Sequence, residues 1–177
     1  MKLLLLFLMA STSGYSQYVA VNTIDEFTGD RKIQVNCMTG NHWGESDKVT
    51  KGLFNHVYLT AQYIQSKNSD IGIKFFTLNI KNQTSGTCLS KENGKSIFLF
   101  EDKSTLECKQ ISETTCKSAD LLANYAIDSE ELSILITKKL QKIRIYTTDG
   151  YVDYEIKPEK IEALQQTFLV LKQTIAK

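Results

Sequence analysis

Hydrophobic and polar residues alternate along most of this chain, which predicts a protein built mainly from β-strands. In the segment 32–38, the side chains of Ile33, Val35 and Cys37 fall on one face. A period of two is typical of a strand with one buried and one exposed face. The long segment Leu53–Gln65 shows the same alternation and is also predicted to be a strand.

The segment Ile71–Ile80 is predicted to be a strand with an irregularity. Its apolar residues change parity at Phe75 and Phe76. An extra residue in a strand shifts the following side chains to the other face, so this change predicts a β-bulge. Further strands are predicted over Tyr18–Ile24, Ser104–Ile111 and Asp120–Ile127.

Two dipeptides, Asn93-Gly94 and Asp149-Gly150, predict tight β-hairpins. A type I′ turn needs a positive φ at both central residues, which Asn, Asp and Gly tolerate best. The strands that flank these two turns are predicted over Thr87–Lys91, Lys95–Phe100, Lys142–Thr147 and Tyr151–Ile156.

Two helices are predicted in the C-terminal part. Ser129 can cap the first one, and the acidic residues that follow suit the positive end of a helix dipole. The second begins at Pro158, because the first turn of a helix does not need its N–H group. Its apolar stripe has helical spacing and consists of Ile161, Leu164, Phe168, Leu171 and Ile175. We therefore expect an α+β fold that is mainly antiparallel β, as a single sheet or a two-layer sandwich, with the C-terminal amphipathic helix packed on it.

Residues Met1–Ser16 predict a secretory signal peptide. Lys2 gives a positive start, and an unbroken apolar run, Leu3–Ala10, is followed by small and polar residues. This layout is typical of an export signal that is cut before Gln17. A membrane anchor is the alternative, but the run is shorter than the roughly 20 residues that cross a bilayer. We expect a protein of the periplasm or the extracellular space.

Residues 17–177 are expected to form a single globular domain, since their number suits one hydrophobic core. The whole chain has 21 basic and 20 acidic residues, and one of the basic residues, Lys2, lies in the signal segment. A balanced chain without a basic block lacks the charge that nucleic acid attracts. We expect no nucleic-acid partner and no transmembrane segment after signal cleavage.

The four cysteines are Cys37, Cys88, Cys108 and Cys116. An even number in an exported chain favours disulfides over a metal site. The preferred pairing is Cys108–Cys116 with Cys37–Cys88, because the first bond would close a short loop between neighbouring strands. Free, buried thiols are the alternative. The chain has no C-x-x-C motif, so neither a thioredoxin-like redox site nor a zinc knuckle is expected.

Three segments carry a resemblance to other proteins. They are Asp25–Gly29, the Asn93-Gly94 turn followed by Ile97–Phe100, and Lys142–Tyr151, which has the sequence KIRIYTTDGY. On these residues the chain resembles a group of small, uncharacterised exported proteins of Bacteroidetes-type bacteria. The resemblance implies a single exported domain, periplasmic or surface-associated, with the Lys142–Tyr151 hairpin as a shared framework element. It implies no activity, cofactor or catalytic residue.

Motifs for catalysis and metal binding are weak. The histidines His42 and His56 could join Glu45 or Asp47 in a metal site, but H-x-H and H-E-x-x-H spacings do not occur. The serine motifs G-x-S-x-G and S-x-x-K are missing, and so are the glycine-rich phosphate loops. We expect no metal and no cofactor. Carboxylate pairs for glycoside cleavage could be drawn from Asp25, Glu26, Asp149, Asp153 and Glu155.

Aromatic residues give the clearest indication of binding. Trp43, next to His42 in a polar, glycine-bearing segment, has no obvious place in the core, although it could pack under its own loop. Three tyrosines crowd one predicted hairpin: Tyr146, Tyr151 and Tyr154. Such rings can stack on sugars or anchor a partner protein, and cross-strand packing is the alternative for the tyrosines. The candidate ligand-binding residues are Trp43, His42, Tyr146 and Tyr151.

These observations predict a non-enzymatic exported protein that binds a protein or a glycan, or that serves the cell envelope. A carboxylate-based hydrolase is the second hypothesis, and it requires two acids in one cleft. A small-ligand carrier or an inhibitor is the third. It requires an apolar cavity between the sheet and the terminal helix.

Overall fold

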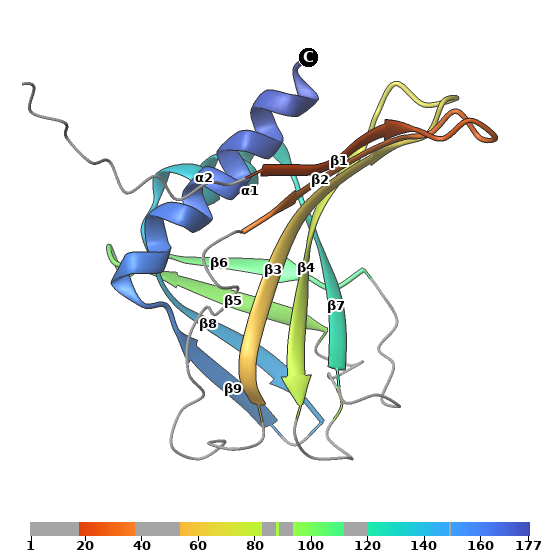
Figure 1. Cartoon of the computed structure of the whole chain (residues 1–177). Helices are drawn as coiled ribbons and strands as arrows, with labels where there is room; N and C mark the ends of the chain where they lie inside the picture. The colour runs from red at the N-terminus through yellow and green to blue at the C-terminus, as the bar shows by residue number, and fades with distance from the viewer. Residues whose placement is uncertain (1–17, 38–53, 83–87, 89–93, 112–119, 149) are drawn as a thin grey trace, which may run out of the picture.

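The computed structural model describes residues 18–37, 54–82, 88, 94–111, 120–148 and 150–177 (Figure 1). These residues form two antiparallel β-sheets and two helices. The α+β fold with mainly antiparallel strands and a packed C-terminal helix is confirmed, in its two-sheet form.

The larger sheet has five strands in the spatial order β1-β2-β3-β4-β7. These strands are β1 (Tyr18–Ile24), β2 (Arg31–Asn36), β3 (Phe54–Gln65), β4 (Ile73–Asn82) and β7 (Asp120–Ile127). The smaller sheet has four strands in the order β6-β5-β8-β9. Its strands are β5 (Lys95–Phe100), β6 (Thr105–Lys109), β8 (Leu140–Thr147) and β9 (Gly150–Glu155).

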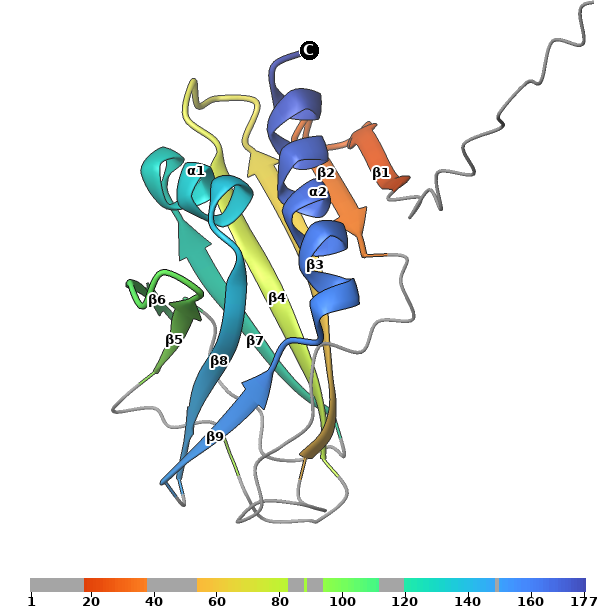
Figure 2. The same ribbon diagram turned by 90° about the vertical axis from the view of Figure 1, so that its left-hand side faces the viewer.

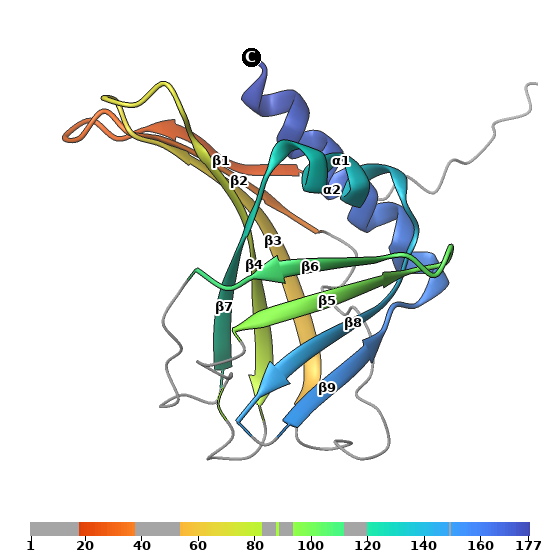
Figure 3. The same ribbon diagram turned by 180° about the vertical axis from the view of Figure 1, so that it is seen from behind.

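The two sheets lie face to face, and Figure 3 shows the smaller one in front of the larger one, with their strands crossing steeply. Side chains alternate in burial along β5 and β6 of the smaller sheet, as in β5, where Ser96, Phe98 and Phe100 are buried. Alternation places one face of each sheet in the core and the other outside.

Phe76 lies where both sheets and the C-terminal helix α2 (Pro158–Ile175) meet. Its ring stacks on Tyr125 of β7 at 5.1 Å between centroids, and it contacts Phe98 of the smaller sheet at 5.3 Å. The ring of Phe168 from α2 approaches edge-on at 6.2 Å. All four rings are buried, so they join the three parts into one core.

Helix α2 packs against β1, β2 and β3 and beside the shorter helix α1 (Ser129–Thr137), as Figure 2 shows. It begins at Pro158, as predicted, and the stripe residues from Ile161 to Leu171 are buried. The guanidinium of Arg31 in β2 donates to the carbonyl of Thr174 at 3.0 Å. This bond satisfies a carbonyl of the last helical turn, which has no partner within the helix.

Two local predictions are wrong. The register of β4 with both neighbours runs without a break through Phe75 and Phe76, so there is no bulge at that point. Both rings are buried although they lie on opposite faces, which explains the apparent change of parity. The cap of α1 is Asp128 rather than Ser129, and it exchanges hydrogen bonds with Glu131 in a capping box.

The predicted strands occur at about the expected positions, but the sequence did not predict which strands pair with one another in the sheets. Strand β6 belongs to the smaller sheet and β7 to the larger one. A bridge between Gln110 and Tyr125 links these segments, and next to it the Ile111 N–H donates to the carbonyl of Asn124. The β8–β9 hairpin is confirmed, but Gly150 pairs with Thr147 and begins β9, so it does not lie at the centre of the turn as predicted. Its φ of 119° favours glycine. The strand expected over Thr87–Lys91 falls largely outside the described residues.

Candidate functional site

The outer face of the smaller sheet gathers tyrosines and charged side chains, and we call it the tyrosine face. Alternation along the strands directs these side chains away from the core. The tyrosine face consists of Lys95, Glu107, Lys142, Arg144, Tyr146, Tyr151, Asp153 and Glu155, with the half-buried Ile97 and Leu99 of β5 between them. It thus brings together two of the predicted ligand-binding residues, Tyr146 and Tyr151, on neighbouring strands.

Arg144 is the centre of the tyrosine face. Its guanidinium donates two hydrogen bonds to the carboxylate of Asp153, at 2.7 and 2.8 Å. The same guanidinium lies 3.8 Å from the centroid of the Tyr151 ring, a cation–π contact. The bond to Asp153 raises the pKa of Arg144, which reinforces its positive charge. The Arg144 guanidinium and the Asp153 carboxylate are therefore held in one orientation, while the Tyr151 side chain stays on the surface.

Tyr146, which lies opposite Tyr151 on β8, also has a cation over its ring. The Lys95 ammonium lies 5.5 Å from its ring centroid and forms an ion pair with Glu107 at 2.8 Å. The rings of Tyr146 and Tyr151 are 6.4 Å apart and tilted by 58°. The tyrosines therefore do pack across strands. This packing also fixes their positions, and Tyr151 remains 48% exposed.

The other predicted ligand-binding residues are not placed by the structure. Trp43 and His42 lie outside the described residues, as do Glu45 and Asp47. His56 lies in β3. Among the residues that the structure describes, no group of three or more His, Cys, Asp or Glu side chains could hold a metal ion.

Three of the described carboxylates of the hydrolase hypothesis have structural partners. Asp25 accepts hydrogen bonds from the backbone N–H groups of Thr28 and Phe27, which lower its pKa. Asp153 binds Arg144, and Glu155 lies 3.3 Å from the ammonium of Lys142. A general acid needs a raised pKa, which is the opposite of what the turn does to Asp25. Asp149 lies outside the described residues.

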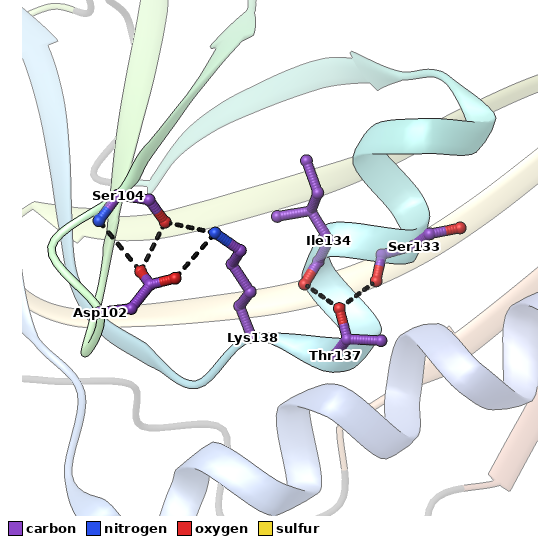
Figure 4. Close-up of polar contacts among 6 residues, drawn as sticks. All are labelled: Asp102, Ser104, Ser133, Ile134, Thr137 and Lys138. Atoms are coloured by element: carbon purple, nitrogen blue, oxygen red, sulfur yellow. Dashed lines mark hydrogen bonds and ion pairs between the residues drawn. The ribbon is translucent and has the colours of Figure 1, made fainter.

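A polar cluster that the sequence analysis did not predict joins the β5–β6 turn to the end of α1 (Figure 4). The ammonium of Lys138 lies 2.8 Å from Asp102 and 2.7 Å from the hydroxyl of Ser104. The Ser104 hydroxyl in turn donates to Asp102. In a catalytic Ser–Lys pair, the serine hydroxyl donates its proton to a neutral amine. Here Lys138 donates to Ser104, and Ser104 donates to Asp102, so the hydrogen bonds do not have that arrangement. The cluster stabilises the turn.

Asp102 is expected to titrate at unusually low pH. Hydrogen bonds from Lys138 and then from Ser104 lower its pKa from 3.8 to about 2. Because the folded-state pKa is depressed, the contact stabilises the fold above about pH 4 and is lost as the pH falls through about 2. NMR titration of the Asp102 carboxyl carbon measures this directly, and Lys138→Met should move the midpoint towards 3.8. A midpoint near 3.8 in the unmodified protein would contradict the contact.

The preferred disulfide pairing is wrong. Cys37 and Cys108 are buried thiols, so neither Cys108–Cys116 nor Cys37–Cys88 is formed. Burial raises the pKa of Cys108, which keeps it protonated and a poor nucleophile at neutral pH. The alternative of buried thiols therefore applies to these two cysteines, and Cys116 lies outside the described residues.

The tyrosine face is thus an ordered array of rings and paired charges on the outer side of the smaller sheet. No helix within the described part of the chain is long and apolar enough to cross a membrane. Comparison of the chain with protein-family models, with curated proteins and with solved structures gives no match.

Proposed function

We propose that this chain is an exported, non-enzymatic binding protein and that the tyrosine face holds its protein partner. The observation that carries the proposal is the contact of Arg144 with both Asp153 and the Tyr151 ring. Tyrosine and arginine supply much of the binding energy in protein interfaces. Side chains already fixed in position lose little entropy when a partner binds.

Export supports this proposal from the sequence side. Residues Met1–Ser16 have the layout of a signal peptide, and the resemblance to exported Bacteroidetes-type proteins agrees with it. We place the protein in the periplasm or on the outside of the cell. A protein that leaves the cytosol and offers a rigid surface suits a role in the cell envelope.

The carrier hypothesis receives less support than the binding hypothesis. It required an apolar cavity beneath the terminal helix. Under α2, Phe168 meets Phe76 in ring contact, and Phe76 meets Phe98 of the opposite sheet. These aromatic side chains occupy the space between the helix and the two sheets, where a carrier would hold its ligand.

Affinity capture from envelope extracts of the source cells tests the binding proposal. The tagged protein is expected to retain a partner that Arg144→Ala and Tyr151→Ala each weaken at least tenfold. Glu162→Ala, on the exposed side of α2, is the matched control and should leave capture unchanged. Circular dichroism must show that all three variants are folded. Equal capture by the wild type and both tyrosine-face variants would refute the proposal.

A further inference from the structure

The cysteines of this chain differ in their surroundings, and the difference identifies a covalent bond. Cys37 follows β2 of the larger sheet and Cys108 lies in β6 of the smaller one, and both are free, buried thiols. Cys88, by contrast, is only half-buried, and its sulfur is disulfide-bonded. The chain has four cysteines in all. Cys116 is therefore the one partner that the chain can still offer to Cys88.

The backbone of Cys88 is attached to the smaller sheet. Its carbonyl accepts a hydrogen bond from the Thr148 N–H at 2.8 Å, and its N–H donates to the Thr148 hydroxyl at 3.2 Å. Thr148 directly follows β8, a strand that begins just after α1 and ends at Thr147. Cys88 is therefore held at the end of the smaller sheet that lies away from the two helices (Figures 1 and 3).

The larger sheet brings the segment that contains Cys116 to the same end of the molecule. Strand β7 leads into α1 at its last residue, so its first residue, Asp120, lies away from the helices, where it pairs with Lys81. Cys116 precedes Asp120 by four residues. Four residues span at most about 14 Å, and packed sheets lie about 10 Å apart. The chain before β7 is therefore long enough to reach Cys88 on the other sheet.

We propose that Cys88 and Cys116 form a disulfide that joins the two sheets at the end opposite to the helices. The core around Phe76 joins the sheets near α2, and the disulfide joins them at the other end. When the bond forms, two thiols lose two protons and two electrons. The disulfide of a thiol oxidoreductase accepts them by thiol–disulfide exchange and becomes a dithiol. Such oxidation is typical of compartments outside the cytosol, and it does not depend on the tyrosine face.

Thiol counting and peptide mapping test the bond in protein isolated from the source cells, with free thiols blocked at lysis. In the denatured protein, two thiols should react before reduction, those of Cys37 and Cys108, and all four should react after it. A pair of tryptic peptides joined through Cys88 and Cys116 is expected, and reductant should separate it. Four reactive thiols before reduction, or a peptide that joins Cys88 to another cysteine, would overturn the inference.

Serine variants test what the bond does. Cys88→Ser and Cys116→Ser should each lower the thermal unfolding midpoint by about 5–10 °C, because the bond closes a long loop of the unfolded chain. The double variant should lose no more than either single variant, since both changes act through one bond. Reductant should lower the midpoint of the wild type by the same amount and leave the variants unchanged. Additive losses in the double variant, or a wild type insensitive to reductant, would contradict the bond.

Discussion

Phe168→Asp is expected to lower the free energy of unfolding by several kcal/mol and to leave the chain unfolded at physiological temperature. Phe168 is completely buried and lies edge-on to Phe76, where α2 meets the larger sheet. Truncation of a buried phenylalanine alone costs about 3–5 kcal/mol. The aspartate adds a charge that has no partner in this apolar position. Since domains are typically stable by only about 5–15 kcal/mol, the loss is a large part of the total.

Urea denaturation followed by circular dichroism measures this effect. Gln173→Ala on the exposed side of the same helix is the matched control, and it should change stability by less than about 0.5 kcal/mol. A Phe168→Asp protein with an unchanged urea midpoint would mean that α2 does not close the core.

Asp153→Ala is expected to have the second largest effect, about 1–2 kcal/mol of destabilisation. The Asp153 side chain is only 10% exposed, and it accepts both hydrogen bonds from Arg144. Hydrogen bonds to charged groups contribute roughly 1.5–3 kcal/mol. The Arg144 side chain is 38% exposed, so solvent can partly replace the lost partner and reduces the expected cost.

A double-mutant cycle separates the ion pair from other effects of Asp153→Ala. In Arg144→Met with Asp153→Ala, neither charge is left without its partner. The double variant should therefore be at least as stable as Asp153→Ala, and its destabilisation should be smaller than the sum of the single effects. Strictly additive single effects would show that the pair contributes no coupling energy. In that case Arg144 would not be held rigidly on the tyrosine face.

Much of the fold could be predicted because its signals are local. Alternation identifies a strand without reference to other segments, and the stripe from Ile161 to Ile175 identifies α2 in the same way. The assignment of strands to sheets depends on contacts between distant residues. Nothing local indicates that β6 and β7 belong to different sheets. The bulge predicted at Phe75 and Phe76 failed because a residue can be buried on the outer face of a sheet as well as on the inner one.

The candidate site was predictable only in part. Tyr146 and Tyr151 lie in one hairpin, so the sequence alone brings them together. A turn centred on Asp149-Gly150 would pair Arg144 with Glu155, whereas the observed register pairs Arg144 with Asp153. The contact of Lys138 with Asp102 spans 36 positions and depends on the tertiary fold. The pattern Asp-x-Ser at residues 102–104 was the only local sign, because such side chains often bond to turn backbone.

The proposed binding surface depends on the core beneath it. The tyrosine face carries rings and paired charges on the smaller sheet, and this sheet must not move relative to the larger one. The packing of Phe76 against Phe98 and Phe168 supplies that rigidity.

Native-state hydrogen exchange of the α2 amides tests this shared core most directly. If α2 and the two sheets form one cooperative body, the buried turns of Pro158–Ile175 will exchange only through global unfolding. Their opening free energy will then equal that of the slowest amides in β4 and β5, and it will fall by the same amount with denaturant. Exchange of the α2 amides at a clearly lower free energy, while β4 and β5 stay protected, would contradict the account.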